Sequence, residues 1–271
     1  MFKRKVNITR IKKGQKEETN DIVLYESSID IFVNSKPIVN IICLPKDLKE
    51  LSVGFLFSVG IINIIDDIKD ITVNELENSI YINLNEKIKF NAEKLEIEPV
   101  SRVIDTTCGI PSAWRNSIKA KLDEANNKNS LKLKLNVRLK ADTIFSAMKE
   151  MQISTELFRE TGGCHGAAIF DMNGDLLSVK EDIGRHNAID KVIGDLLLKE
   201  HDFENIFLTS TGRLTGDSVL KAIRAKIPIF ASISTAVESG IRLAFAYGMT
   251  LIGFVRGKKM NIYTHPERII L

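Results

Sequence analysis

Apolar and polar positions divide the chain into a first part of predicted hairpins and a later part in which strands and helices alternate. Residues 22 to 44 carry two β-rich runs separated by the turn-forming cluster 34 to 37, and this pattern predicts a hairpin. Residues 45 to 60 begin with proline, repeat apolar positions at helical spacing and end in glycine, which predicts a helix. Residues 70 to 100 alternate again and predict a second hairpin. The first hundred residues therefore indicate a small α+β unit.

From about residue 140 the pattern changes to strands alternating with amphipathic helices. AAIFDMNGDLLSVKE predicts a hairpin turned on Asn173-Gly174, and the apolar stripe that follows predicts a helix over 188 to 197. Two strand–helix units, beginning NIFLTS and PIFASIS, come next, and MTLIGFV is a last buried-type strand. The second of these helices would start at a capping box, Thr235-Ala236-Val237-Glu238, and carries Val237, Ile241 and Phe245 as its apolar positions. This alternation is typical of a sheet covered by crossover helices, so the predicted fold class is α/β.

Between about 101 and 135 the periodic pattern lapses into a Thr-Thr-Cys-Gly loop and a polar, lysine-rich stretch. The sequence thus predicts three parts: an α+β domain over 1–104, a cysteine loop and connector over 105–138, and an α/β domain over 139–271.

Composition excludes several classes of protein. A chain of 271 residues, 44% hydrophobic and 27% charged, has the composition of a folded globular protein. Its longest apolar stretch falls short of the roughly 20 residues that a bilayer span needs, and the basic N-terminus lacks the apolar core of a secretory signal. We therefore expect a cytoplasmic protein with an exposed N-terminal arm and no membrane segment. A net charge of +3 does not indicate a nucleic-acid-coating protein, so any anion must be held locally.

The three cysteines, odd in number and widely spaced, fit neither a disulfide framework nor a paired zinc ligand set. Cys108 lies in the polar loop DTTCGIPS, where solvent and nearby donors favour the reactive thiolate, so it is either a working thiol or an incidental loop cysteine. Cys43, in VNIICLP, is expected in the core. Cys164 precedes His165, but neighbouring side chains of an extended chain point to opposite faces, so adjacency alone gives no ion pair.

Three segments of the C-terminal half favour anions. Gly184-Arg185-His186 would stand at the entry to a helix, either as an oxyanion site or as a capping turn with a surface histidine. Residues 208 to 218 form a strand–glycine–helix segment, although without the Gly-Lys-Ser/Thr ending of a Walker loop. Residues 256 to 259 form a basic loop after a strand. Each signal is weak alone, and together they indicate anion binding.

Several motifs, in order and spacing, resemble the formate dehydrogenase accessory sulfurtransferase family, FdhD. They are GFLFSVGII, the Thr-Thr-Cys-Gly loop, TGGCHGAAIFD, EDIGRHNAIDK and GFVRGKKMNIYTHPERI. The resemblance runs from about residue 20 to the end. It implies a carrier that takes sulfur from a cysteine desulfurase as a cysteine persulfide. The carrier would deliver this sulfur to the molybdenum, or tungsten, bis(guanine dinucleotide) pterin cofactor of formate dehydrogenase. A homodimer is implied as well.

The resemblance also assigns residues. Cys108 matches the persulfide cysteine. Our own hypothesis, from the anion-favouring turn described above, is that Gly184-Arg185-His186 complete the cofactor pocket. The family's cofactor-binding stretch matches Val255, Arg256, Gly257, Lys258, Lys259 and Met260. The C-terminal domain of the family resembles cytidine deaminases, but this chain lacks the His-x-Glu pair and the paired cysteines of a zinc deaminase, so no zinc and no deamination are expected.

One departure from the family pattern leaves alternatives open. Pro111 stands where many members carry a second loop cysteine, so the loop has no resolving thiol unless Cys164 takes that part. A carrier needs only one nucleophile. The alternatives are a chaperone that binds the pterin cofactor without moving sulfur, and a nucleotide hydrolase that uses Cys108 or His165.

Overall fold

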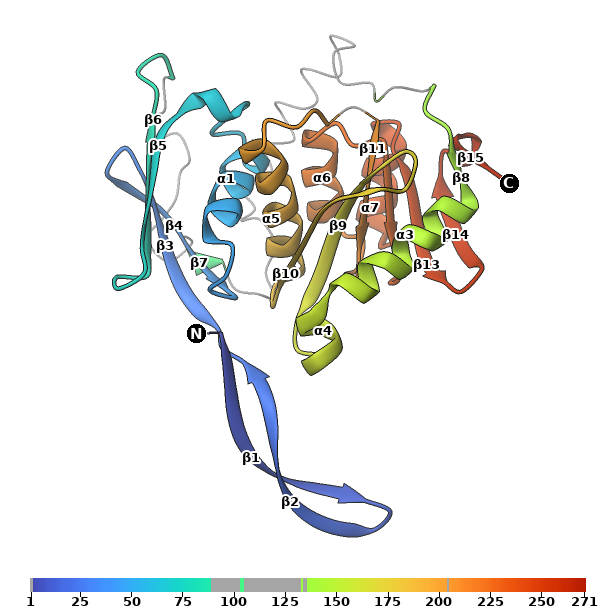
Figure 1. The fold of residues 1–271 in the computed structure, drawn as a ribbon. Helices are drawn as coiled ribbons and strands as arrows, with labels where there is room; N and C mark the ends of the chain where they lie inside the picture. Colours follow the sequence, from blue (N-terminus) through green and yellow to red (C-terminus); the bar gives the residue numbers. More distant parts are fainter. Residues whose placement is uncertain (1, 89–102, 105–132, 134–135, 204) are drawn as a thin grey trace.

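The computed structural model describes residues 2–88, 103–104, 133, 136–203 and 205–271. Two larger sheets enclose a layer of helices, and a thin hairpin projects from the body (Figure 1). Strands and helices alternate along the second half of the chain. The predicted α/β fold class is confirmed.

The first sheet has the strand order β5-β6-β3-β4-β7. β3 (Ser27–Val33) and β4 (Lys36–Cys43) form the predicted hairpin, and its two turn residues, Asn34 and Ser35, both have positive φ, as a tight hairpin turn requires. β5 (Ile68–Asn74), preceded by the short 3-10 helix η1 (Ile65–Asp67), pairs antiparallel with β6 (Ser79–Leu84). The second predicted hairpin is thus confirmed as far as residue 84. β7 (Val103–Ile104) pairs parallel with β4.

The second sheet has the order β10-β9-β11-β12-β13-β14. β9 (His165–Asp171) and β10 (Leu176–Asp182) form the predicted hairpin, in which Gly174 takes the positive φ of the turn. β11 (Ile206–Ser210), β12 (Ile229–Ser232) and β13 (Thr250–Arg256) are parallel, and β14 (Lys259–Thr264) returns antiparallel. At the far side, β8 (Leu139–Lys140) pairs with β15 (Ile269–Ile270), which the short η4 (Pro266–Arg268) precedes.

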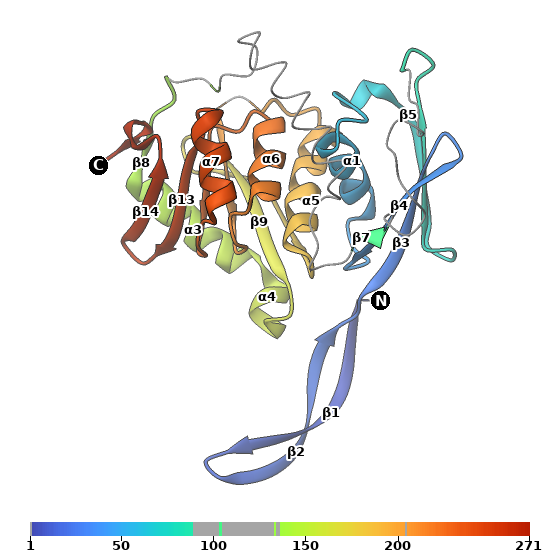
Figure 2. The same cartoon turned by 180° about the vertical axis from the view of Figure 1, so that it is seen from behind.

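Helices cover both faces of this second sheet (Figures 1 and 2). α5 (Arg185–Leu198), α6 (Gly216–Arg224) and α7 (Glu238–Ala246) lie on one face, and α3 (Ala141–Ser154), followed by α4 (Glu156–Thr161), lies on the other. Apolar side chains of β9 and β11 point alternately into the two cores, as the pleat of a strand requires.

The α7 prediction is only partly right. The helix ends before Gly248 as expected, but Val237 is its N-cap and makes no side-chain cap hydrogen bond, so the predicted capping box is wrong. The predicted apolar positions Val237 and Phe245 are 38% and 68% exposed, while Gly240 and Ala244 are buried. A Cβ on Gly240 would lie 2.4 Å from the carbonyl oxygen of Leu214, so the helix turns its small residues inward to approach that backbone.

α1 (Leu48–Ser58) joins the two sheets. It covers the first sheet and crosses α5 at two glycines, where an added Cβ on Gly54 would lie 1.8 Å from the carbonyl oxygen of Asp190, and one on Gly194 would lie 1.9 Å from that of Glu50. One apolar core runs through the helices to both sheets. The division at 1–104, 105–138 and 139–271 stays a prediction, because most of the middle segment lies outside the described residues.

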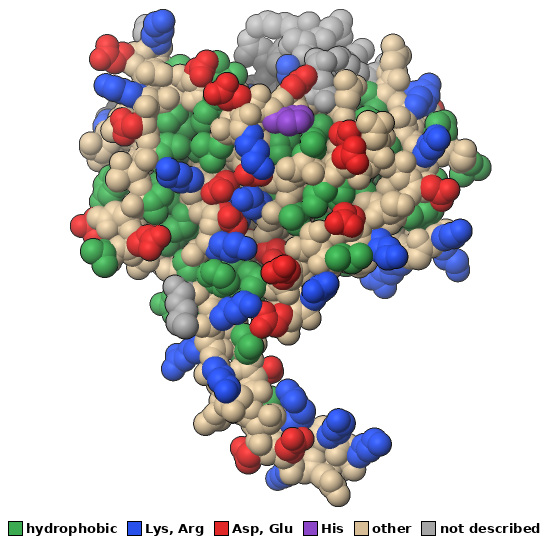
Figure 3. Space-filling model, viewed as in Figure 1, with side chains coloured by type: hydrophobic (Ala, Val, Ile, Leu, Met, Phe, Trp, Pro, Cys, Tyr) green, Lys and Arg blue, Asp and Glu red, His purple; other side chains and the backbone are tan. Residues whose placement is uncertain are grey.

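The N-terminal arm is a hairpin of β1 (Lys3–Lys12) and β2 (Gln15–Leu24) that projects from the body. Lys and Arg side chains follow it toward its tip (Figure 3). The expected exposed arm is therefore confirmed. Among the described residues, no helix is both long and apolar enough to cross a membrane.

Candidate functional site

One edge of the second sheet gathers the segments that favour anions. β11, β12 and β13 are parallel, so their carboxyl ends meet at one edge. β10 runs in the same direction, because β10 and β11 are both antiparallel to β9. The starts of β9, α5 and α6 therefore lie at this edge too, which is where open α/β sheets bind ligands. We call it the strand-end edge.

Gly184 and Arg185 form the first group at this edge. Gly184 is the N-cap of α5, and its backbone N–H donates to Asp182 Oδ1 at 2.8 Å. The stem of Arg185 lies against Gly212, where an added Cβ would come within 2.8 Å of Arg185 Cβ. Arg185 Nε is buried and makes no hydrogen bond within the described part of the chain. The structure thus brings two predicted segments, 184–186 and 208–218, into contact.

His186 was expected either at an oxyanion site or on the surface. It is only 5% exposed, and its Nε2 lies 3.3 Å from Thr215 Oγ1, the N-cap hydroxyl of α6. The surface-histidine alternative is therefore wrong. From this place His186 links the starts of α5 and α6.

His165 belongs to the same edge. Thr211 Oγ1 accepts the backbone N–H of Gly166 at 3.0 Å and lies 3.1 Å from His165 Nδ1. Burial, Arg185 and Arg213 lower the pKa of His165, against the opposing effect of Asp182, and so favour the neutral ring. Burial and Arg213 also lower the pKa of Arg185, while Asp217 opposes them. Arg185 and Arg213 thus place positive charge at this edge, with Asp182 and Asp217 beside them, and this positive charge suits an anionic ligand.

The basic loop is the turn between β13 and β14. Arg256, Lys258 and Lys259 are exposed, and Gly257 has a φ of 58°. Arg256 Nε donates to the carbonyl oxygen of Ile233 at 3.2 Å, and Ile233 N in turn donates to Ser210 O at the end of β11. The turn is therefore held toward the ends of the neighbouring strands.

The two flanking residues of this predicted stretch differ from the rest of it. Val255 is 2% exposed and packs in the core, so only its backbone could touch a ligand, and Met260 is partly buried.

The two described cysteines are buried. Cys43 lies in the core, as predicted, and burial raises its pKa to about 12. Cys164 is 4% exposed, with its Sγ 3.8 Å from Glu181 Oε1, and burial together with Glu181 raises its pKa to about 12. This environment argues against Cys164 as a resolving thiol. Cys108 lies outside the described residues.

Comparison with known proteins gives a match over nearly the whole chain. The model of the FdhD/NarQ family matches residues 24–270. The chain belongs to this family. The sulfur carrier protein FdhD of Sulfolobus acidocaldarius is 37% identical over 99% of both chains, and that of Saccharolobus solfataricus is 36% identical over 98% of both. A crystal structure from Desulfotalea psychrophila, described as a formate dehydrogenase accessory protein, covers both chains completely with a TM-score of 0.77 and 30% identity.

The family motif EDIGRHNAIDK contains residues whose role sequence reasoning missed. Asp182 pairs with Lys191 at 2.7 Å, both side chains being 0% exposed, and each also binds the backbone of Leu44 at 3.1 Å. Asn187 Nδ2 donates to the carbonyl oxygen of Ile42 at 3.0 Å. These contacts tie the start of α5 to the end of β4. The sequence did offer one sign of these contacts: two neighbouring charged residues, Asp190 and Lys191, interrupt the apolar stripe of the predicted helix.

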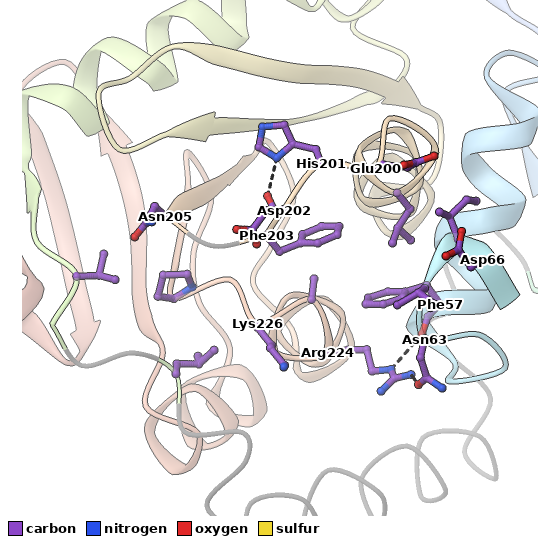
Figure 4. Close-up of a pocket in the computed structure, with 17 residues that line it drawn as sticks. Phe57, Asn63, Asp66, Glu200, His201, Asp202, Phe203, Asn205, Arg224 and Lys226 are labelled. Carbon is purple, nitrogen blue, oxygen red and sulfur yellow. Dashed lines mark hydrogen bonds between the residues drawn. The ribbon is translucent and has the colours of Figure 1, made fainter.

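A cavity of about 820 Å³ opens at the opposite end of α5 and α6 (Figure 4). Phe57, His201 and Phe203 are among its lining residues. Arg224 turns toward Asn63 there and donates to its side chain and to the carbonyl oxygens of Phe57 and Ile62. That arginine is engaged in holding the loop after α1, so we place the anion site at the strand-end edge and not in this cavity. Within the described ranges, no group of three His, Cys, Asp or Glu side chains is placed to hold a metal ion.

Proposed function

We propose that this protein is a sulfur carrier that loads sulfur onto Cys108 and delivers it to the bis(guanine dinucleotide) pterin cofactor, with molybdenum or tungsten, for formate dehydrogenase. The observation that carries this proposal is the end-to-end similarity to relatives named sulfur carrier protein FdhD. The positive strand-end edge supports the cofactor-binding part, because each guanine dinucleotide carries a pyrophosphate. In this proposal the protein is a cytoplasmic homodimer whose partners are a cysteine desulfurase and formate dehydrogenase.

Loading is an exchange between sulfur atoms. The Cys108 thiolate attacks the outer sulfur of the desulfurase persulfide, a bond forms between these two sulfurs, and the donor's S–S bond breaks. The donor cysteine leaves as a thiolate, and Cys108 then carries the outer sulfur as a persulfide. One thiolate replaces another, so the exchange requires no external oxidant or reductant.

Ile104, the last described residue before Cys108, ends a strand that runs toward the strand-end edge. β7 runs parallel to β4, so the chain leaves Ile104 in the direction of Leu44, whose backbone N–H binds Asp182 two residues before Gly184. Four residues span at most about 14 Å. This covalent limit supports a route for sulfur between Cys108 and the end of β10.

The cofactor is the carrier's substrate. Arg256, Lys258 and Lys259 would hold its phosphates, with the backbone of Val255 and Gly257 and the stem of Met260 beside them. Gly184 and Arg185 would complete the pocket, with His186 supporting them through Thr215. Arginine and lysine beside exposed backbone N–H groups are the usual donors to phosphate oxygens. A resident zinc ion has no part in this proposal.

Intact-protein mass spectrometry after incubation with a cysteine desulfurase and cysteine tests the carrier role. We expect the wild type to gain the mass of a sulfur atom and Cys108→Ala to gain none. Cys164→Ala is the matched control and should load like the wild type, because its buried thiol has a pKa of about 12. Loading that persists in Cys108→Ala would contradict the proposal.

A cofactor chaperone that moves no sulfur is the second candidate. Pro111 replaces a second loop cysteine, and both described cysteines are buried, which favours this alternative. Formate dehydrogenase maturation in cells that carry Cys108→Ser separates the two functions. Loss of maturation with intact cofactor binding supports the carrier, whereas full maturation supports the chaperone.

A further inference from the structure

Phe254, near the end of β13, has a strained backbone conformation. Its φ is 54°, in the left-handed region that a bulky side chain rarely occupies. Glycine takes this conformation without steric cost, and yet phenylalanine stands here, directly after Gly253. A hydrogen bond of 2.8 Å from the Phe254 backbone N–H to Ser234 O holds the residue in place. A bulky residue kept in a sparsely populated conformation points to a function for its side chain.

The strained residue belongs to a β-bulge between β13 and β14. The register shifts between Gly253 and Arg256, where β13 has one residue more than β14. In a regular strand, Phe254 would share a face with Ile252 and point into the core between the sheet and α3. The extra residue gives that place to Val255, which is 2% exposed in the same core. The bulge thus turns Phe254 out of the core, and bulges that re-aim a side chain are frequent beside functional sites.

The ring that is turned outward lies at the strand-end edge. Phe254 is 41% exposed, and its contact with Ser234 places it beside the end of β12. The guanidinium of Arg256 lies over the ring, 6.0 Å from its centroid, which is the outer limit of such a contact. Arg256 Nε also donates to Ile233 O at 3.2 Å, so this arginine has an anchor that does not require the ring. An aromatic surface and a cation of the basic turn therefore stand side by side.

Phosphate donors lie near the Phe254 ring on both sides. Lys258 and Lys259 follow it in the turn between β13 and β14 and are exposed. In the other direction, only β12 separates β13 from β11, so the ends of β13 and β11 lie about 10 Å apart. Gly212 follows β11, and the stem of Arg185 lies against it. A flat apolar ring between two groups of cations matches a nucleoside diphosphate, whose base is flat and whose phosphates are anionic.

We propose that Phe254 is the surface on which a base of the cofactor's guanine dinucleotides stacks, while the neighbouring cations hold the phosphates. The proposal rests on the proposed function, because the nucleotide enters this edge as part of the cofactor. The ring offers a flat surface that needs no hydrogen bond from the base, so it adds affinity for a nucleotide and no preference among bases. The bulge keeps the ring exposed before the ligand arrives.

Phe245 shows what an incidental exposed aromatic looks like in this chain. Single apolar side chains are common on protein surfaces. Phe245 is 68% exposed, but it lies on the regular helix α7 and its ring stacks on His265 with a centroid separation of 5.5 Å. It stands in the last turn of α7, just before β13 begins, and therefore at the opposite edge of the sheet. Phe245 is thus the matched control for Phe254.

Calorimetry with GDP, ADP and pyrophosphate tests the stacking surface. We expect Phe254→Ala to weaken binding of GDP and of ADP by the same factor, about tenfold, because every base stacks on the ring. Binding of pyrophosphate should not change, since it has no base, and this result also shows that the edge is folded in the variant. Phe254→Trp should retain the affinity for both nucleotides. Phe245→Ala should bind all three ligands like the wild type.

Three results would overturn the proposal, and they differ in what else they reject. Equal GDP affinities of the wild type and Phe254→Ala would reject the stacking surface alone. Equal losses for GDP and pyrophosphate would show that the ring acts only through Arg256. A wild type that binds neither GDP nor pyrophosphate would reject the nucleotide site of the proposed function as well. Sulfur loading on Cys108 should persist in every variant, which keeps a failure here distinct from a failure of the carrier role.

Discussion

At the scale of single residues, the surroundings of Cys164 determine whether its side chain is a thiol or a thiolate. Cys164 lies beside Glu181, whose carboxylate accepts the backbone N–H groups of Leu157 and Phe158 at 3.1 and 2.7 Å. That carboxylate is therefore held as an acceptor at the start of α4. A thiolate next to it would face a like charge in a desolvated place, and the thiol stays protonated.

The first prediction follows from this pKa. The pKa of Cys164 rises from 9.0 to about 12, so the thiol is the favoured form below pH 12. At pH 8 the fraction of Cys164 present as thiolate is therefore about a thousandfold below that of an ordinary thiol. In Cys108→Ser, iodoacetamide at pH 8 should leave native Cys164 unmodified and label it fully in urea. Peptide mass spectrometry gives the readout, and rapid labelling of native Cys164 would show that its thiolate is accessible.

Gly212 allows a second prediction at this scale. Because Gly212 has no side chain, the stem of Arg185 can lie against it, and Gly212→Ala should displace Arg185. GDP serves as a probe of the strand-end edge. We expect Gly212→Ala to weaken GDP binding by about tenfold, measured by calorimetry. Gly163→Ala is the control, because a Cβ there meets only ordinary contacts of 3.4 Å or more. Equal GDP affinities in the two variants would place the nucleotide away from Arg185.

At the scale of elements, close contact between helices determines the arrangement of α1 and α5. Glycines on both helices let each approach the other's backbone, much closer than helices that meet through larger side chains. Ser58 Oγ then reaches Asp190 Oδ1 at 2.6 Å, and Asp190 also pairs with Lys221 of α6. Three helices are thus linked around one buried carboxylate.

The helix crossing gives the third prediction. In an isolated helix, Gly→Ala stabilises by up to about 1 kcal/mol, but at position 194 the new Cβ would overlap the backbone oxygen of Glu50. Gly194→Ala should therefore lower the free energy of unfolding by about 2 kcal/mol or more in urea titration. The Gly163→Ala control should change it by less than about 0.5 kcal/mol. Stabilisation by Gly194→Ala would mean that the helices stand further apart.

At the scale of the whole molecule, buried polar pairs connect the two sheets. Asp182 and Lys191 of the second half both bind the backbone of Leu44 in the first half, and neither side chain reaches solvent. Removing one member leaves a buried charge without its partner, which is costly, whereas an exposed pair contributes little.

The fourth prediction compares two lysines. Lys191→Met should lower the free energy of unfolding by about 3–5 kcal/mol, and adding Asp182→Asn should restore part of it, because the uncompensated charge is gone. Lys199→Met removes an ion pair of similar length, 2.7 Å, at a lysine that is 57% exposed, and should change stability by less than about 1 kcal/mol. Circular dichroism in urea measures all three variants. Similar losses at Lys191 and Lys199 would contradict a role for the buried pair.

The sequence alone determined the elements whose signal is local. The hairpins at 34–35 and 173–174 and the alternation of the second half were predicted, because turn residues and apolar periodicity act over a few positions. A helix within residues 45 to 60 was predicted as well, although α1 begins only at Leu48 and ends at Ser58. The family could also be identified from local sequence. Each of its motifs is short, but several of them in a fixed order are specific to the family. Cys43 was correctly placed in the core, because it stands in an apolar run.

Only the tertiary structure decided which side of α7 faces inward, that His186 is buried, and why Asp190 and Lys191 interrupt an apolar stripe. Each depends on a partner far along the chain: α7 approaches Leu214, His186 meets Thr215, and Lys191 reaches Leu44 across 147 positions. The convergence of 184–186 with 208–218 at one sheet edge likewise follows from strand order. Apolar periodicity predicts that a helix has an apolar and a polar face. Which face is buried depends on contacts with segments far along the chain, and the local sequence does not specify these contacts.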